Sequence, residues 1–160
     1  MRKSNIFSIY IFTFIIDLVI KLIIKFNMKV GDTISIIPNF FKIEYLQNTG
    51  AAFSSFEGGR YILIAISILI YFLLIRYIKK NDLSRKIEII SLGLLLGGLV
   101  GNLIDRIFYG YVIDYLSFNI FGYSFAVFNL ADSFIVISVI LLIIDMILVE
   151  IEKRKKNGSR

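Results

Sequence analysis

This sequence contains neither cysteine nor histidine. Without histidine there is no Ser–His–Asp triad, no Cys–His pair and no His-ligated zinc site. Without cysteine there are no thiolate metal sites, no thiol chemistry and no disulfides. Any catalytic chemistry must therefore come from Asp, Glu, Lys, Arg, Ser, Thr, Tyr or Asn.

Apolar residues, in contrast, are in excess. They make up 58% of the 160 residues, and the mean hydropathy is +0.81, whereas soluble domains are about 45–50% apolar. Four apolar blocks each approach the roughly 20 residues that cross a bilayer as a helix. The sequence therefore predicts a single integral membrane domain over 1–160. Its spans are expected at about residues 6–26, 61–77, 87–107 and 132–149.

Positive charge is distributed unevenly around these blocks. Of the 18 Lys and Arg, 12 lie before the first block, between the second and third, or after the fourth. The positive-inside rule then places both termini and the short middle loop in the cytoplasm. The net charge of +6 is explained by this topology, without a nucleic-acid partner. We expect the basic tail, residues 151–160, to be disordered and held by anionic headgroups.

The two outer segments, residues 27–60 and 108–131, have features of folded structure. Residues 41–47, FKIEYLQ, alternate apolar and polar side chains as a β-strand does. Residues 109–116, YGYVIDYL, have a similar composition, and Gly58-Gly59 predicts a turn before the second block. A small β structure is therefore expected on the outer side.

Polar residues interrupt the first and third blocks. Asp17 and Lys21 are four residues apart, so they share one helix face; they form either an ion pair that orients the helix or part of a site. Gly93, Gly97 and Gly101 recur at four-residue intervals, as in closely packed membrane helices. Packing is the expected role of these glycines.

Further polar residues lie at the outer ends of the third and fourth blocks. Asn102, Asp105 and Arg106 either end a helix with a local ion pair or belong to a site. Asn129 and Asp132 have the spacing of an N-cap and the N3 residue of a capping box, and the same two residues are also candidates for a site. Capping and catalysis both stay open for them.

Asp114 lies within an aromatic stretch, where a turn or a surface strand position would also account for it. Asp145 lies 13 residues after Asp132, about 20 Å along a helix, so we expect it to be a snorkelling or interhelical residue. The topology places eight polar residues in or near the outer half of the membrane, and their convergence favours one shared site. They are Asp17, Lys21, Asn102, Asp105, Arg106, Asp114, Asn129 and Asp132.

Four motifs, in order along residues 15–145, resemble those of the bacterial lipoprotein signal peptidases, the signal peptidase II family. NTGAAFS at 48–54 resembles its Asn-x-Gly-x-Ala-Phe segment. GGLVGNLIDRIFYGYVIDYLSF at 97–118 is similar to its Gly-x-x-Gly-Asn-x-x-Asp-Arg and Val-x-Asp-Phe motifs, and FAVFNLADSFIVI at 125–137 to its Phe-Asn-x-Ala-Asp-Ser motif. Asp17 and Lys21 match an Asp-x-x-x-Lys pair. Together these motifs are highly specific.

The resemblance implies that Asp114 and Asp132 are the catalytic aspartates. It also implies an all-α membrane fold of four transmembrane helices, with a small extracytoplasmic β-cradle and a short helix at the membrane surface. Two positions depart from the family pattern: Ala126 stands where many members have Pro, and Tyr115 replaces the usual Phe. The implied substrate-binding or supporting residues are Asn48, Gly50, Phe53, Asn102, Asp105, Arg106, Asn129, Asp17 and Lys21.

The implied function is that of an intramembrane aspartic endopeptidase, which cuts prolipoproteins before the diacylglyceryl-modified Cys. Two adjacent carboxylates share one proton, so one can activate water while the other polarises the carbonyl. No metal or cofactor is required. The expected partners are prolipoproteins and membrane lipids, with no nucleic acid, and one chain suffices. The expected location is the bacterial cytoplasmic membrane, with the active site toward the outer face.

Two alternatives remain open at this point. In the first, a small four-helix transporter or channel would use the internal carboxylates as a polar path. In the second, a non-catalytic membrane scaffold would tolerate Asp-to-Asn changes. The transporter is less well supported than the peptidase because the carboxylates gather on one side instead of crossing the bilayer.

Overall fold

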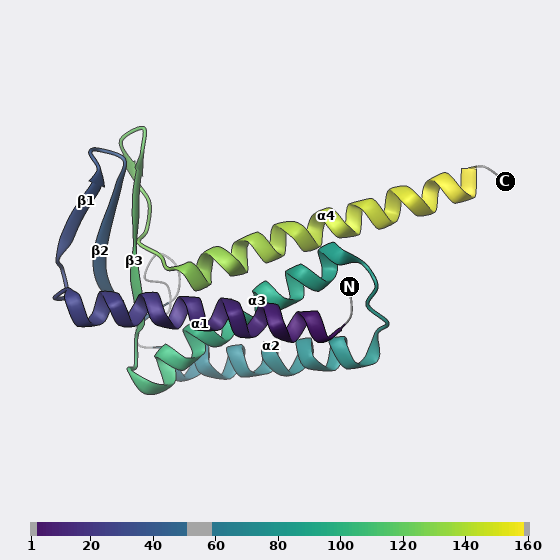
Figure 1. The fold of residues 1–160 in the computed structure, drawn as a ribbon, viewed down its shortest axis with the longest axis horizontal. Coiled ribbons are helices and arrows are strands. Elements are labelled where there is room, and N and C mark those ends of the chain that lie inside the picture. The colour runs from purple at the N-terminus through teal and green to yellow at the C-terminus, as the bar shows by residue number, and fades with distance from the viewer. Residues whose placement is uncertain (1–2, 51–58, 159–160) are drawn as a thin grey trace.

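A computed structural model describes residues 3–50 and 59–158. It contains four long helices and one small sheet (Figure 1). Each helix is long and apolar enough to cross a membrane, which confirms the predicted number of spans. The helices are α1 (Ser4–Asn27), α2 (Arg60–Lys80), α3 (Lys86–Phe108) and α4 (Leu130–Gly158). The strands are β1 (Thr33–Ile37), β2 (Phe41–Asn48), β3 (Val112–Ile120) and β4 (Tyr123–Ser124).

Helix α3 is the centre of the bundle. Most of its apolar stretch is buried, whereas only a small share of the apolar stretches of α2 and α4 is buried. The predicted glycine stripe explains this packing. A Cβ at Gly93 would lie 2.6 Å from the Cβ of Ile9, and one at Gly97 would collide with the Thr13 hydroxyl. The glycines therefore let α1 approach α3 closely, as the sequence predicted.

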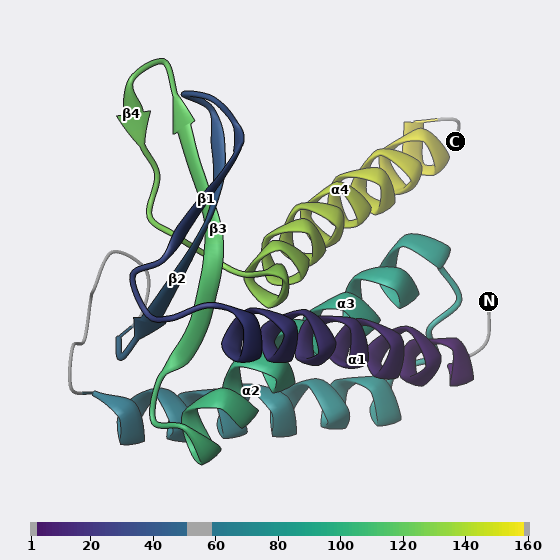
Figure 2. The ribbon, with the colours of Figure 1, turned by 60° about the vertical axis from the view of Figure 1, so that its left-hand side comes forward.

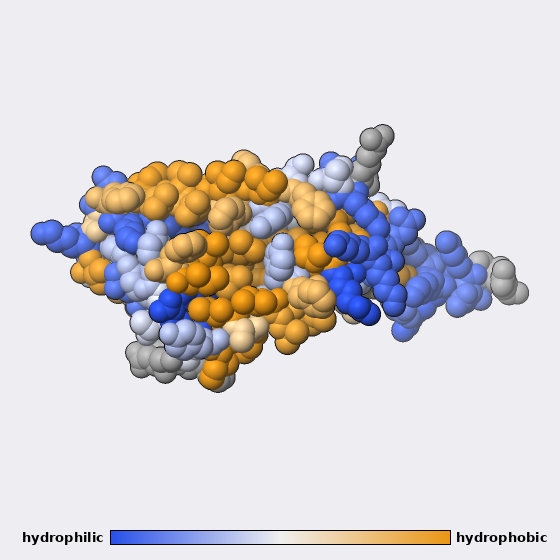
Figure 3. Space-filling model, turned by 90° about the horizontal axis from the view of Figure 1, so that it is seen from below, coloured by the Kyte–Doolittle hydropathy of each residue, from blue (hydrophilic) through white to orange (hydrophobic). Residues whose placement is uncertain are grey.

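The outer surface of the helices is apolar. In the space-filling view, an apolar band lies between two hydrophilic ends (Figure 3). Large side chains such as Phe12, Phe72 and Met146 are exposed on α1, α2 and α4. This surface would be unfavourable in water but suits the hydrocarbon core of a bilayer.

The four strands form one antiparallel sheet in the order β1-β2-β3-β4. It stands at one end of the bundle, and in both ribbon views its strands run across the helix axes (Figures 1 and 2). Strand β2 confirms the strand predicted at 41–47. Strand β3 begins later than predicted, at Val112, because Tyr109 still ends α3 and Gly110 turns the chain with a positive φ of 85°.

The sheet register places the strand residues of the site. Asn48 pairs with Val112, and Leu46 pairs with Asp114, so Asn48 and Asp114 lie close together on adjacent strands. A bridge between Leu116 and Phe128 then ties β3 to the segment that enters α4. These pairings bring the end of β2, the start of β3 and the start of α4 together.

The prediction of a disordered basic tail was wrong, because α4 continues through these residues to Gly158. Lys, Arg and Glu are good helix formers, and Glu150 pairs with Arg154 one turn later at 2.9 Å. The proposed short surface helix is not among the helices of the described residues. Residues 51–58 lie outside the described residues, and they include Phe53 and the first glycine of the predicted Gly58-Gly59 turn. The second glycine, Gly59, directly precedes α2.

Candidate active site

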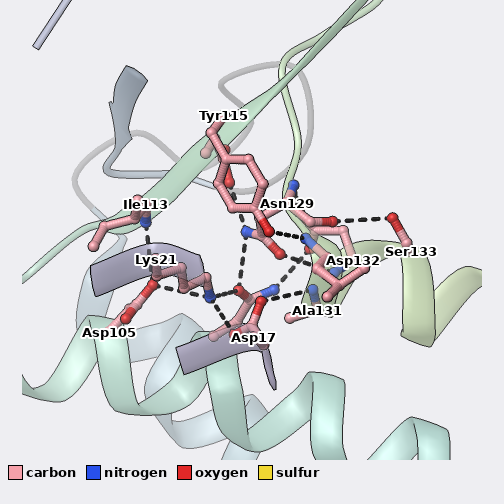
Figure 4. A network of polar contacts seen from close by, with 12 residues as sticks. Asp17, Lys21, Asp105, Ile113, Tyr115, Asn129, Ala131, Asp132 and Ser133 are labelled. Carbon is pink, nitrogen blue, oxygen red and sulfur yellow. Dashed lines mark hydrogen bonds and ion pairs between the residues drawn. The ribbon is translucent and has the colours of Figure 1, made fainter. Parts of the chain in front are cut away.

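A buried lysine is the centre of the polar cluster at the end of the bundle beside the sheet (Figure 4). The Nζ of Lys21 lies 2.8 Å from Asp17 Oδ2 and 3.0 Å from Asp105 Oδ2. It also donates a hydrogen bond of 2.9 Å to Asn102 Oδ1. The side chains of Lys21, Asp17 and Asp105 are each 1% exposed. The ammonium group therefore has two carboxylate oxygens and one amide oxygen close to it, away from water.

The two carboxylates of this cluster also hold neighbouring elements in place. Asp17 Oδ1 accepts a hydrogen bond from the backbone N–H of Ala131, in the first turn of α4, at 2.9 Å. Asp105 Oδ2 accepts one from the backbone N–H of Ile113 on β3 at 3.1 Å. The cluster thus joins α1, α3, α4 and β3. The alternative local pair is not formed: the ion-pair partner of Asp105 in the described chain is Lys21 and not Arg106.

Side-chain amides connect the cluster to two further aspartates. Asn102 donates through Nδ2 to Asp132 Oδ1 at 2.7 Å. Asn129 donates through Nδ2 to Asp114 Oδ1 at 2.7 Å and to Asn102 Oδ1 at 3.1 Å. Asn48 donates to the other oxygen of Asp114 at 2.8 Å. Amide donors therefore orient both oxygens of Asp114 and one oxygen of Asp132.

The start of α4 is a capping box, as one of the two interpretations predicted. Asn129 Oδ1 accepts from the backbone N–H of Asp132 at 2.9 Å, and Asp132 Oδ2 accepts from the backbone N–H of Asn129 at 3.2 Å. The remaining atoms of both side chains face the cluster. Capping therefore fixes the orientation of Asp132 and Asn129 and does not compete with a role in a site.

Arg106 and Gly50 meet beside this network. Arg106 Nη2 donates to the carbonyl of Gly50 at 2.9 Å, and the Gly50 N–H donates to Asn48 Oδ1 at 2.9 Å. The guanidinium thereby holds the end of β2 against α3. Of the predicted site residues, only Phe53 lies outside the described residues.

Two positions in this region were missed in the sequence. Arg60 donates to the carbonyls of Arg106 and Ile107 at 2.8 Å each, so these backbone carbonyls at the end of α3 have hydrogen-bond partners. The Tyr115 hydroxyl accepts from the N–H of Leu130 at 3.2 Å, at the start of α4. No local motif signals either contact. Asp145 is interhelical, as expected, and lies 2.7 Å from Arg85 Nε.

The two aspartates that the amides orient, Asp114 and Asp132, line one cavity of about 1380 Å³. Its polar end also carries Asn48, Asn102 and Arg106. Its apolar wall is formed by side chains of α3, α4 and the β3–α4 connection. These include Leu99, Phe125, Phe128, Ile135, Val136 and Ile137. The cavity therefore suits a ligand with one polar part and one strongly apolar part.

Burial, together with the nearby Asp132 carboxylate, raises the pKa of Asp114 to about 7. Hydrogen bonds from Asn48 and Asn129 and the charge of Lys21 act in the opposite direction. A carboxyl group with this pKa holds a proton near neutral pH and can still give it up. That behaviour suits a general acid or base. The described residues contain no group of three His, Cys, Asp or Glu side chains placed to hold a metal ion.

Comparison with known proteins identifies the family. A model of the signal peptidase II (SPase II) family matches residues 9–148. The chain belongs to the signal peptidase II family. It is 43% identical to a lipoprotein signal peptidase of Halothermothrix orenii over 139 residues, which cover 87% of this chain and 92% of that protein. It is 38% identical to a lipoprotein signal peptidase of Staphylococcus aureus over 148 residues, or 92% and 91% of the two chains.

Solved structures agree with this membership. Two chains described as bacterial membrane enzymes are each 38% identical to this one. The first has a TM-score of 0.85 and covers 90% of this chain and 88% of its own. The second has a TM-score of 0.81, with 89% and 92% covered. The four spans and the small sheet are therefore those of a multi-pass membrane peptidase.

Proposed function

We propose that this protein removes signal peptides from prolipoproteins and that Asp114 and Asp132 are its catalytic pair. Signal peptide removal follows from family membership. The observation that supports this pair is the bridge made by Asn129. Its side chain donates to Asp114 and its backbone N–H donates to Asp132, while both carboxylates line the same cavity.

The proposed chemistry needs one proton shared by the two carboxylates. The ionised group takes a proton from a water molecule, which attacks the scissile carbonyl carbon. The protonated group donates a hydrogen bond to the carbonyl oxygen and stabilises the developing charge. Collapse of the tetrahedral intermediate breaks the C–N bond, and the leaving amine takes up a proton from the pair. Because the groups are coupled, they titrate as one unit.

The surrounding residues have separate roles in this proposal. Asn102 and Asn129 orient the carboxylates, and Lys21, Asp17 and Asp105 fix the elements from which they project. Arg106 and the end of β2 border the polar part of the cavity, where the peptide backbone of the substrate would lie. Because the rest of the wall is apolar and reaches α4, it suits the acyl chains of a diacylglyceryl-modified Cys.

The proposed orientation follows from the distribution of charge. Both termini and the α2–α3 loop carry most of the Lys and Arg, so we place them in the cytoplasm and the site toward the outer face. The location is then the bacterial cytoplasmic membrane. All described site residues belong to one chain, so a monomer would suffice. The transporter alternative gains no support, since the Asp114–Asp132 cavity and the Arg85–Asp145 pair lie at opposite ends of the helices.

The test is to make Asp114→Asn and Asp132→Asn separately and to measure cleavage of a lipid-modified precursor in detergent or vesicles. Each change removes the charge and preserves the shape, so we expect a loss of at least about 10³-fold in kcat, comparable to disabling an acid–base pair. Asp145→Asn is the matched control and should cleave normally. Full activity of either Asp114→Asn or Asp132→Asn, with the fold verified, would disprove the assignment.

A further inference from the structure

The hairpin formed by β3 and β4 carries no charge beyond Asp114. Residues 115–131 contain no Asp, Glu, Lys or Arg, but four Phe and two Tyr. The β1–β2 hairpin and its approach carry charges at Lys29, Asp32, Lys42 and Glu44. A hairpin tip in water is ordinarily polar. Beyond Asp114 this hairpin is therefore uncharged and aromatic, which is unfavourable for a tip surrounded by water.

The tip of this hairpin is a tight turn with an unusual residue. Ile120 pairs with Tyr123, and the two residues between them, Phe121 and Gly122, have φ values of 52° and 83°. Such turns favour Asn, Asp and Gly because both positions need a positive φ. Placing Phe in this region costs about 1–2 kcal/mol. The turn therefore retains an aromatic residue at a position where Asn would be easier to accommodate.

The aromatic side chain at this strained position is fully exposed in the isolated chain. Neighbouring Ile120, Tyr123 and Phe125 are exposed as well, and the rings of Tyr123 and Phe125 pack edge to face at 5.3 Å. Backbone strain and exposed apolar surface would both be unfavourable in water. An apolar environment around the tip would offset both costs.

The position of the hairpin indicates what that environment is. Its strands run across the helix axes where α3 ends and α4 begins, and the tip extends beyond the bundle in both views (Figures 1 and 2). Since the helix axes cross the bilayer, such a sheet lies along the membrane surface. The tip is then above lipid and beside the apolar surface of α4, at the depth where aromatic side chains are enriched.

We infer that Ile120, Phe121, Tyr123 and Phe125, here called the aromatic tip, insert into the headgroup and upper acyl region of the adjacent leaflet. The occupant of this surface is the lipid bilayer, because the tip carries no charge and exposes apolar side chains, as the lipid-facing surface of the helices does. Insertion anchors β3, which carries Asp114, at a fixed depth. The inference rests on the membrane fold and does not require the proposed catalytic pair.

The absence of tryptophan from the sequence makes a direct test possible. Phe121→Trp places a single fluorophore at the tip of a protein reconstituted in phosphatidylglycerol–phosphatidylcholine vesicles. Lipids brominated on the upper acyl chain serve as quenchers, and iodide serves as the quencher from water. Phe12→Trp, exposed on α1, is the lipid control, and Asn157→Trp, exposed on the basic end of α4, is the water control.

For Phe121→Trp we expect blue-shifted emission and quenching by brominated lipid several-fold stronger than for Asn157→Trp, with little quenching by iodide. Emission and quenching like those of Asn157→Trp would overturn the proposal and leave the tip in water. Blue-shifted emission without quenching by brominated lipid would also overturn it, since the tip would then be covered by protein, such as a second copy of the chain.

A second pair of variants separates insertion from folding. Phe121→Asn should preserve or raise the thermal stability in detergent, because Asn accepts the positive φ more readily. In vesicles, the Tyr123→Trp probe should lose most of its lipid quenching when Phe121→Asn is added. Unchanged quenching in the double variant would show that the aromatic side chain at position 121 does not drive insertion.

Discussion

Two ion clusters at opposite ends of the bundle have the same set of charges but very different surroundings. Each cluster has one cationic side chain between two carboxylates. In the cluster beside the sheet, here called the outer cluster, all three side chains are 1% exposed. In the cluster at the other end, here called the inner cluster, the side chain of Asp145 is 10% exposed, that of Arg85 is 29% exposed and that of Glu152 is 63% exposed. The members are Lys21 with Asp17 and Asp105, and Arg85 with Asp145 and Glu152.

The difference shows how burial changes the role of an ion pair. Water and salt reach Arg85 and Glu152 and weaken the inner cluster, which connects α4 with the residue before α3. The outer cluster has no such screening, and its carboxylates also accept backbone N–H groups from two other elements. Removing one member there leaves uncompensated buried charge.

The largest effect is therefore expected for Lys21→Met, which removes the central cation of the outer cluster. Two buried carboxylates would lose their partner, so we expect the free energy of unfolding to fall by about 3–5 kcal/mol. The measurement is reversible unfolding in detergent. Adding Asp17→Asn and Asp105→Asn should recover part of the loss. A decrease in the free energy of unfolding as small as that for breaking a surface ion pair would contradict the comparison.

Gly97→Ala tests the helix contact that brings α1 and its lysine against α3. Because the added Cβ would collide with Thr13, overpacking should cost about 1–3 kcal/mol. Thermal unfolding of the detergent-solubilised protein measures this. Combining the change with Thr13→Ala should restore part of the stability, and no improvement in the double variant would argue against a steric cause.

Asn48→Ala tests whether the pH dependence of cleavage arises at the outer end. If the active form needs one shared proton, the rate falls as pH rises through the pKa of Asp114, which is about 7. The Asn48 hydrogen bond lowers this pKa, so removing it should shift the alkaline limb of kcat/KM to higher pH, together with some loss of kcat. A shift to lower pH would contradict the proposal.

The smallest effect is expected for Arg85→Met, the inner counterpart of Lys21→Met. Its change in unfolding free energy should be several-fold smaller and should shrink further in high salt, because the pair is partly exposed. Cleavage and its pH profile should stay as in the unchanged protein. If Arg85→Met were as destabilising as Lys21→Met, burial would not be the property that separates the two clusters.

Much of the architecture was predictable because its signals are local. Apolar length marked the four spans, and charge asymmetry together with the motifs gathered Asn102, Asp114, Asn129 and Asp132 into one region. Partner choice was not predictable, since it depends on distances across the fold. The proximity of Asp105 to Arg106 in the sequence suggested a local pair, yet the ammonium of Lys21, on another helix, occupies that carboxylate.

The ends of helices and strands were the other feature that the sequence did not predict correctly. The helix propensity of the basic tail and its pairing with Arg85 kept α4 helical where charge alone suggested disorder. The late start of β3 depended on where α3 ended. The pairing of Glu152 with Arg85 joins segments far apart in the chain, which no short window of sequence contains.

The hydrogen bond from Lys21 to Asn102 also determines the direction in which an amide points. An ammonium group can only donate, so the Asn102 oxygen must face Lys21, and its nitrogen is left to face Asp132. A flip of the amide would place oxygen against carboxylate and nitrogen against ammonium. The charge of Lys21 on α1 therefore fixes the orientation of the Asn102 amide, and with it the hydrogen bond that Asp132 on α4 accepts.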